Sequence, residues 1–284
     1  MNEYEQTPSH YLLGHTAHEL RRLDLQGQIY GPITRAALRS AGIGAGARVL
    51  DIGCGSGDVS RTIADAVGPN GHVLGIDRGA RAIEAATAKV SDLGLEHVSF
   101  EQHELDEFET ADAFDAVVGR FILMHQREPG RTLSAVTLSV RPGGTVLMIE
   151  SWMNVLRTGA HSEPYSDLYA EIVEWKSLVV EGAGADLAAG GRLRATFAEA
   201  GLVDVRTHLE ALYAGAVESP YFEYVEQSVR SMLPEARRLG LGGFTEETSE
   251  GLADRLRDEV GRRNGGLVAW PVVVAIGRVP EARD

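Results

Sequence analysis

The sequence predicts an α/β protein built around a doubly wound, mostly parallel sheet of seven strands. Helices are expected before the first strand and in insertions after the fifth. Two observations support this prediction: short apolar stretches alternate with helical stretches between residues 48 and 150, and glycine clusters separate many of them. Strands that alternate with helices of this size favour right-handed crossovers, and such crossovers give parallel strands.

Seven short segments have the composition of strands, and they lie at residues 48–52, 72–77, 98–103, 114–120, 145–150, 202–209 and 268–279. Helices are expected between them at 59–67, 80–93, 129–140 and 192–200. Ahead of the first strand, apolar residues at helical spacing predict helix over 15–38, and Gly31-Pro32 is expected to break or kink it. Further helical stretches are expected at 165–180, 221–232 and 247–263.

Composition and charge exclude several classes of protein. The chain has 284 residues, 44% of them apolar, and a net charge of −14 that disfavours nucleic acid or an anionic membrane as a partner. Its single cysteine, Cys54, its acidic and polar first residues and the lack of a long apolar run predict a cytoplasmic protein. The nine histidines show no metal-ligand spacing, so no metal is expected.

The most informative stretch is 49–58, where a predicted strand ends in a glycine-rich turn that opens a helix. Glycine lets the backbone approach a ligand closely and adopt conformations that a Cβ forbids. A phosphate-binding P-loop needs Lys followed by Ser or Thr, and a dinucleotide turn reads G-x-G-x-x-G. Here Gly53, Gly55 and Gly57 read G-x-G-x-G between Asp51 and Asp58, which suits a cationic ligand rather than a pyrophosphate.

A further carboxylate, Asp77, ends the next predicted strand. A carboxylate at such a strand end can accept hydrogen bonds from both hydroxyls of an adenosine ribose. The glycine turn and Asp77 together predict a nucleoside site beside an acidic pocket.

The stretch VLDIGCGSG at 49–57 resembles the first motif of the class I methyltransferases that use S-adenosylmethionine (SAM), and it matches that motif without departure. The run RPGG at 141–144 is also typical of this family, and the resemblance covers about residues 48–150. Residues 11–20 resemble the lead-in of bacterial small-molecule members, whose first helices fold over the cofactor. The resemblance implies a Rossmann-like methyltransferase core, SAM as cofactor and S-adenosylhomocysteine (SAH) as product.

The resemblance also implies a set of cofactor-binding residues. They are the turn of Gly53, Cys54, Gly55 and Gly57 (methionine part), Asp51 and the backbone of Arg120 (ammonium), Asp77 (ribose), Arg78, Glu104 and Leu105 (adenine), and Tyr11, Gln26 and Tyr30 (lid). Glu104-Leu105 departs from the family, which more often carries Asp there, and Asp106 is an alternative. Tyr30 as a core aromatic and Gln26 as a solvated helix residue are equally open interpretations.

The expected organisation has six parts. They are an N-terminal helical cap (1–40), the SAM-binding core (41–150), a helical insertion (151–191), a core helix and strand (192–210), a second helical insertion (211–266), and the final core strand with a tail (267–284). Long insertions into a compact α/β domain often cover a site, so a substrate lid is expected. The alternative is an interface that pairs two copies as a homodimer.

His125, shortly after the fourth predicted strand, is the first candidate for a general base or an orienting group. A structural role in capping the next segment is the alternative. His161, His15 and His18 are weaker candidates, and Glu150 ends a strand at the same edge. Substrate contacts are expected from aromatic and polar residues of the first insertion, namely Trp152, His161, Tyr165 and Tyr169.

These observations predict transfer of a methyl group from SAM to an oxygen, nitrogen or carbon atom of a small molecule. The aromatic residues of the insertions favour an apolar acceptor such as a specialised metabolite, although helix packing explains them equally well. One alternative is a cyclase or isomerase that binds SAM on the same fold. An NAD-dependent dehydrogenase is disfavoured by the glycine spacing, and a binding protein with a vestigial site is disfavoured by the intact first motif.

Overall fold

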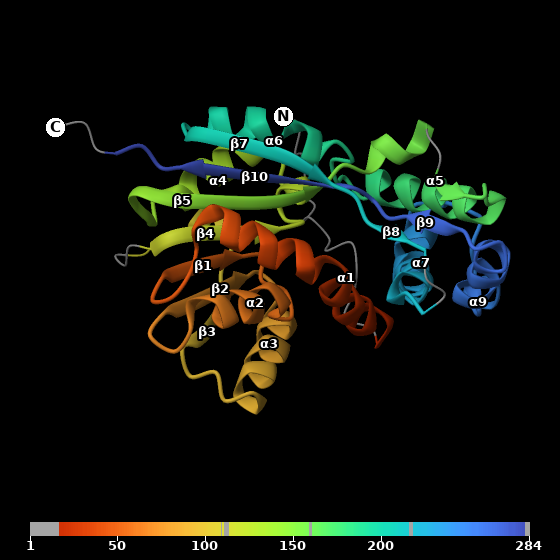
Figure 1. The fold of residues 1–284 in the computed structure, drawn as a ribbon, viewed down its shortest axis with the longest axis horizontal. Coiled ribbons are helices and arrows are strands. Elements are labelled where there is room, and N and C mark those ends of the chain that lie inside the picture. Colours follow the sequence, from red (N-terminus) through yellow and green to blue (C-terminus); the bar gives the residue numbers. More distant parts are fainter. Residues whose placement is uncertain (1–16, 109, 111–113, 159–160, 216–217, 282–284) are drawn as a thin grey trace, which may run out of the picture.

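A computed structural model describes residues 17–108, 110, 114–158, 161–215 and 218–281. Figure 1 shows a twisted sheet with a group of helices beside one end. The sheet has the order β3-β2-β1-β4-β5-β10-β7 and contains β1 (Arg48–Ile52), β2 (His72–Asp77), β3 (Val98–Gln102), β4 (Phe114–Arg120), β5 (Val140–Ser151), β7 (Val203–Glu210) and β10 (Val272–Arg278). β10 runs antiparallel to both neighbours, and the pairs from β3 to β5 are parallel. The predicted fold class is confirmed.

Helices cover both faces of this sheet. One face carries α1 (Ala17–Ala41), α2 (Asp58–Val67) and α3 (Ala80–Asp92), and the other carries α4 (Pro129–Thr137) and α6 (Ala189–Glu199). Side chains of β1 alternate between the two layers: Val49 packs with the first group of helices, whereas Leu50 and Ile52 pack with the second. The carboxyl ends of β1, β2 and β4 therefore meet at one edge, next to the start of α2.

α1 runs through Pro32 as one helix, so the predicted break into two helices at Gly31-Pro32 is wrong. Proline removes one backbone donor and leaves the carbonyl four residues earlier, at Gln28, without its helical partner. Pro32 and Gln28 both lie on the exposed side of α1, where water can satisfy that carbonyl. The opposite side of α1 is held by packing on α2 and on a helix of the insertion.

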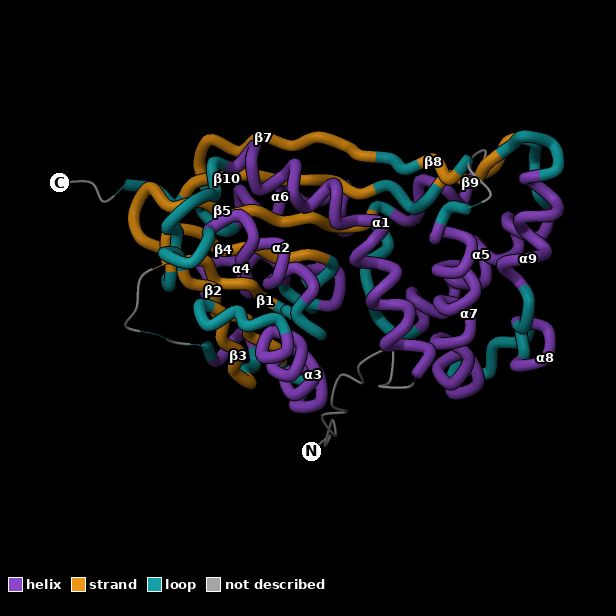
Figure 2. Tube along the Cα trace, turned by 60° about the horizontal axis from the view of Figure 1, so that its bottom comes forward, coloured by secondary structure: helices purple, strands orange, loops and turns teal. Residues whose placement is uncertain are grey.

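The insertions form the group of helices beside the sheet, seen clearly in Figure 2. Its main helices are α5 (Asp167–Gly182), α7 (Pro220–Arg238), α8 (Glu246–Ser249) and α9 (Leu252–Leu256). A small sheet, ordered β6-β9-β8, joins them through β6 (Ser162–Glu163), β8 (Tyr213–Ala214) and β9 (Gly266–Val268). α1 packs against α7 and so connects this helical part to the sheet.

Two predicted strands differ from the structure. The segment predicted as one strand over 268–279 is divided between β9 and β10, which belong to different sheets, and Trp270-Pro271 lies between them. Proline cannot donate to a strand ladder, which accounts for the interruption. β5 starts at Val140 rather than at 145, because the RPGG run forms an irregularity inside the strand, with Gly143 at φ 71°.

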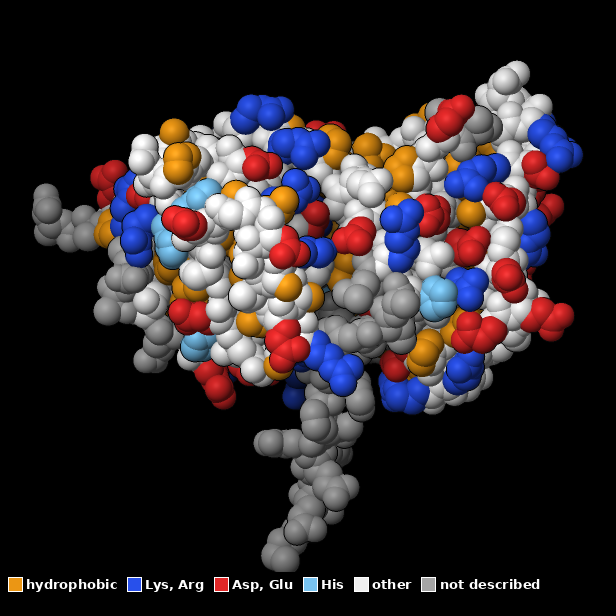
Figure 3. All heavy atoms as spheres, turned by 90° about the horizontal axis from the view of Figure 1, so that it is seen from below, with side chains coloured by type: hydrophobic (Ala, Val, Ile, Leu, Met, Phe, Trp, Pro, Cys, Tyr) orange, Lys and Arg blue, Asp and Glu red, His pale blue; other side chains and the backbone are white. Residues whose placement is uncertain are grey.

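Acidic and basic side chains are mixed over the face of the molecule seen in Figure 3. Many of them are paired within one helix, as in the ion pairs Arg131–Glu128 and Arg262–Asp258. Within the described ranges, no helix has both the length and the apolar character needed to span a bilayer.

Candidate functional site

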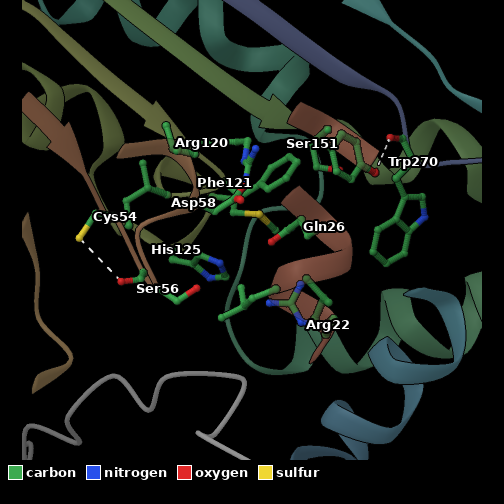
Figure 4. Close-up of a pocket in the computed structure, with 18 of the residues that line it drawn as sticks. Arg22, Gln26, Cys54, Ser56, Asp58, Arg120, Phe121, His125, Ser151 and Trp270 are labelled. Carbon is green, nitrogen blue, oxygen red and sulfur yellow. Dashed lines mark hydrogen bonds and ion pairs between the residues drawn. The ribbon is translucent and has the colours of Figure 1, made fainter. Parts of the chain in front are cut away.

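One cavity lies where the carboxyl ends of the central strands face α1 and the helical part (Figure 4). Its polar end is formed by the glycine turn, the start of α2 and the end of β2. Its apolar end is formed by α5, α7 and the segment before β10. Residues from many parts of the chain line it. Among them are Gln26 and Tyr30 of α1, Gly53–Ser56, Asp58, Asp77, Arg120–Ile122, Met124 and His125, and Val180, Tyr224, Met232 and Trp270.

The glycine turn adopts backbone conformations that other residues rarely reach. Gly53, Gly55 and Gly57 have φ values of 64°, 53° and 80°. A Cβ on Gly57 would lie 3.0 Å from the Phe100 ring and 3.1 Å from Cβ of Ala86, so this glycine allows close packing on β3 and α3. A Cβ on Gly55 would meet no atom within 4 Å, because Gly55 borders the cavity.

Asp77 is fixed by the backbone at the entrance to this turn. Its Oδ2 accepts a hydrogen bond from the Gly55 N–H at 3.0 Å, and its Oδ1 accepts one from the Gly79 N–H at 2.8 Å. A carboxylate oxygen can accept two hydrogen bonds, so each oxygen keeps capacity for another donor. Asp77 lines the cavity and can therefore accept both hydroxyls of a diol.

Arg120 and Asp58 form an ion pair at the wall of the cavity. The Arg120 Nη2 donates to Asp58 Oδ2 at 3.0 Å, and its Nη1 donates to Thr34 Oγ1 at 3.1 Å. The Arg120 side chain is buried and the Asp58 side chain is mostly buried. The pair joins β4, α2 and α1, and it balances both charges in a region of low dielectric constant.

Asp51, expected near a ligand ammonium, lies behind the turn instead of lining the cavity. Its Oδ2 accepts a hydrogen bond from the Ser60 hydroxyl at 2.5 Å, and the residue is fully buried. Burial raises the pKa of Asp51 to about 7, against the lowering effects of Ser60 and Arg120. Its direct contacts are therefore with α2.

The remaining cofactor-binding candidates divide into two groups. Seven of them line the cavity, namely Gln26, Tyr30, Gly53, Cys54, Gly55, Asp77 and Arg120. Arg78, Glu104 and Leu105 are not among its lining residues: Leu105 packs in the core under α4, and Glu104 is exposed. Burial raises the pKa of the Cys54 thiol, so Cys54 serves as a small apolar residue there. Tyr11 lies outside the described residues, as does His15.

His125 lines the cavity, next to Met124 and Phe121. Figure 4 shows its ring facing the same space as Gln26 and Ser56. Loss of hydration lowers the pKa of His125, and the positive charges of Arg78 and Arg22 lower it further, so the imidazole is neutral at neutral pH.

Glu150 supports the loop that carries His125. Its Oε1 accepts hydrogen bonds from the N–H groups of Ile122 at 2.8 Å and Leu123 at 2.7 Å, while Oε2 is buried without a partner among the described residues. Burial raises the pKa of Glu150 to about 7, although the backbone N–H groups of Leu123, Ile122 and Met124 lower it in part. Glu150 acts on this loop and does not itself line the cavity.

The four residues expected to contact substrate lie outside the cavity lining. Trp152 packs over Gly191 of α6, and Tyr165 is exposed. His161 and Tyr169 are buried behind the wall, where the Tyr169 hydroxyl contacts the Tyr221 hydroxyl at 2.7 Å. Other residues take this place, namely Met153, Val180, Tyr224 and Met232 of the two insertions and Trp270 of the segment before β10. The aromatic content of the insertions was the available sequence signal for Tyr224.

A family model described as a methyltransferase domain matches residues 43–201, which is more than half of the chain. The chain belongs to the methyltransferase-domain family. SAM is the cofactor of this family. The match includes the glycine turn, Asp77 and the loop with His125.

Curated relatives of the chain share the core region. The chain is 39% identical over 110 residues to a ubiquinone biosynthesis O-methyltransferase of Aromatoleum aromaticum, covering 38% of this chain and 45% of that protein. It is 33% identical over 118 residues to a demethylmenaquinone methyltransferase of Bacillus cytotoxicus, covering 41% and 50%. The matched region thus spans about half the length of these curated relatives. Among solved structures, the YcgJ protein of Bacillus subtilis aligns with a TM-score of 0.57 at 17% identity over 86% of this chain and 97% of that chain, which shows a shared fold.

The site fits SAM by its own geometry. The diol-binding capacity of Asp77 suits the ribose, and the open backbone at Gly55 leaves room for the methionine part. The Arg120 guanidinium, which a phosphate would need, is already paired with Asp58. The site therefore matches a nucleoside without phosphates.

Proposed function

We propose that the protein transfers a methyl group from SAM to an oxygen, nitrogen or carbon atom of a small, mostly apolar acceptor. One observation carries this proposal: the nucleoside-binding end, with Asp77, and the apolar end, with Tyr224 and Trp270, belong to one cavity. The relatives are named for methyl transfer in connection with quinones, which supports an acceptor that contains a ring.

Bound SAM supplies a methyl group on a sulfonium, already activated for in-line displacement. The chain's contribution is then to hold the acceptor in line and to keep water out. Phe121, Tyr224 and Trp270 provide apolar walls, and Tyr30 closes the side toward α1, packed edge-on against Phe121 with ring centroids 5.2 Å apart. The enclosure comes from helices that the core does not contain.

His125 orients the acceptor in this proposal. Its neutral imidazole can accept a hydrogen bond from an acceptor hydroxyl or amine at the cavity wall. A base is required only where the attacking atom must lose a proton, so the role of His125 depends on the acceptor. Glu150 keeps the His125 loop in place from below.

Calorimetry with SAM and with SAH tests the cofactor half of the proposal. Both are expected to bind, and Asp77→Ala is expected to weaken binding by about 10-fold or more because it removes both ribose acceptors. Asp77→Asn is the matched variant, since it keeps one carbonyl acceptor and is expected to lose less. Undetectable binding of SAM and SAH to the folded wild type would contradict the proposal.

Product analysis tests the transfer half. Incubation with SAM and a panel of small phenols, amines and carboxylic acids is expected to give SAH and methylated product in equal amounts. A rearranged product formed without SAH would instead favour the cyclase or isomerase interpretation.

A further inference from the structure

Lys176 is a buried lysine in the middle of α5, and its amine faces aromatic rings. Lys89 and Lys176 are the only lysines of the chain, and only 3% of Lys176 is exposed. Its Nζ lies 4.3 Å from the centroid of the Trp270 ring and 5.4 Å from that of Tyr224. In the described part of the chain no carboxylate or other hydrogen-bonding group partners this nitrogen. Lysine is rarely buried without a partner.

Trp270 carries a second donor without an acceptor. Its Nε1–H is buried, and no group among the described residues accepts a hydrogen bond from it. An unpartnered buried N–H costs about 1–3 kcal/mol, so such groups usually meet a ligand or water. The two unpartnered donors, the Lys176 amine and the Trp270 indole, belong to side chains in direct contact.

Lys176 lies directly behind the apolar end of the cavity and is not itself among the residues that line it. Trp270 and Tyr224, the rings that Lys176 contacts, line it. Val180 lines it as well, one helical turn after Lys176 on the same face of α5. The face of α5 that carries the amine is therefore the face turned toward the acceptor.

The groups around Lys176 add no negative charge to this place. Arg22 of α1 lies near enough to disfavour the ammonium, and it is paired with Glu19 by two hydrogen bonds of 2.8 and 2.7 Å. From α7, burial raises the pKa of Tyr221, so its phenol stays neutral, as does that of Tyr169 on α5 itself.

On its other side, α5 packs against the segment Met153–Thr158. The charged residue there, Arg157, pairs with the exposed Glu174 and Glu181. Among these described groups, none places a negative charge against the Lys176 amine.

We propose that Lys176 and Trp270 form an oxyanion-binding site at the acceptor end of the cavity, which takes the ionised oxygen of a carboxylic acid or a phenol. This inference rests on the proposed function, because the ligand is the acceptor. The Lys176 ammonium and the indole N–H donate to the same oxygen. With a phenol, the O–H proton moves to the neutral amine, which leaves a phenolate paired with an ammonium. A phenolate is a nucleophile at its oxygen and at its ortho carbon.

The pKa of Lys176 reports directly on whether an anion binds beside its amine. Burial lowers the pKa of Lys176 to about 7, with a smaller contribution from Arg22. An anion within contact distance favours the ammonium and is expected to raise that pKa by about 1–3 units. Because the chain has two lysines, ¹³C-labelled lysine gives two Cε signals, and Lys89, exposed and paired with Asp24, is the internal reference.

The test is a pH titration of labelled protein with SAH present, alone and with benzoate, with 4-nitrophenol, or with uncharged methyl benzoate. The Lys176 signal is expected to shift its midpoint upward with benzoate, with 4-nitrophenol or with both, and the responding probe identifies the oxyanion as carboxylate or phenolate. No shift with either anion would overturn the inference. An equal shift with methyl benzoate would do the same, since it would mean recognition of the ring alone.

Two variants test the contributions of the Lys176 amine and the Trp270 N–H to anion binding one at a time. Lys176→Met removes the amine but keeps an apolar chain of similar shape, so it should fold, and it should lose benzoate binding. Trp270→Phe keeps an aromatic ring and removes only the N–H, and it should weaken benzoate binding about 5- to 10-fold. SAM binding is measured in parallel. If SAM binds and the anions leave Lys176 unchanged, only this inference fails; if SAM itself does not bind, the proposed function fails.

Discussion

At the scale of single residues, Gly53, Gly55 and Gly57 of the same turn differ in how much space a side chain would have. Gly55 borders open space, whereas Gly57 is enclosed by Phe100 and Ala86. All three have positive φ, so any side chain adds backbone strain of about 1–2 kcal/mol, and only an enclosed position adds a clash.

Gly57→Ala is therefore expected to lower the free energy of unfolding by about 2–4 kcal/mol, the sum of backbone strain and overpacking. Gly42→Ala is the matched control, because Gly42 also has a positive φ of 73° but a Cβ there meets no atom within 4 Å. The control should lose only about 1–2 kcal/mol. Urea denaturation of both variants measures the difference, and equal losses would contradict the packing argument.

Glu150 makes stability depend on pH. Its pKa is about 7 in the folded protein against an ordinary value of 4.5. Between these values the folded state holds a proton that the unfolded state has released, so the free energy of unfolding falls as pH rises through this window. The loss, on the order of 1–3 kcal/mol, is complete by about pH 8 and is constant above that pH.

Glu150→Gln keeps the acceptor for Ile122 and Leu123 and removes the titration. The variant is expected to gain stability relative to wild type between pH 5 and pH 8. Asp51 also has a raised pKa of about 7 and contributes the same slope to both proteins, so the difference between them isolates Glu150. Thermal melts across this range give the measurement, and a difference that does not change with pH would refute the assignment.

At the scale of elements, Arg120 ties β4 to α2 and α1 through Asp58 and Thr34. Arg120→Met is expected to cost about 2–4 kcal/mol, because it leaves the mostly buried Asp58 with only its longer ion pair to Arg61, at 3.9 Å. Arg131→Met is the control: its ion pair with Glu128 is largely exposed and should contribute less than about 0.5 kcal/mol. Chemical denaturation compares the two, and similar losses would mean that the Arg120 pair does not join the elements.

The elements that could be predicted from the sequence are those whose signal is local. A short apolar run followed by glycines is enough for β1, and short apolar runs between helical stretches indicated the other strands of the core. The course of α1 through Pro32 depends on which side of the helix meets solvent, which is a tertiary property. β6, β8 and β9 are two or three residues long and are stabilised by pairing across the chain, so no local pattern marks them.

Residues of the site divide in the same way, into those with a local sequence signal and those brought together only by tertiary packing. Gly53, Gly55 and Asp77 follow directly from motif and strand ends, and all three line the cavity. Val180 and Trp270 lie far apart in the sequence and meet only because α5 and the segment before β10 pack together. Lys176 could not be singled out, because its significance lies in having no partner in the described structure, and sequence does not show partners.

At the scale of the whole molecule, the sheet and the helical part share one hydrophobic core. The same cluster of buried residues contains Val49 of β1 and Ile63 of α2 together with Val225 of α7 and Leu256 of α9. α1 lies between the two parts and packs against both. A core that is continuous across the parts favours a single cooperative unfolding transition.

This continuity gives a prediction that the three tryptophans can report. In a Trp152→Phe background, fluorescence comes from Trp175 and Trp270 of the helical part, and Trp175 is fixed by donating to the Gly242 carbonyl at 2.8 Å. Gly57→Ala, a change at the sheet, is expected to lower the fluorescence midpoint as much as the far-UV circular dichroism midpoint, because both parts unfold together. A fluorescence midpoint that stays at its original denaturant concentration while the circular dichroism midpoint falls would mean that the helical part unfolds on its own.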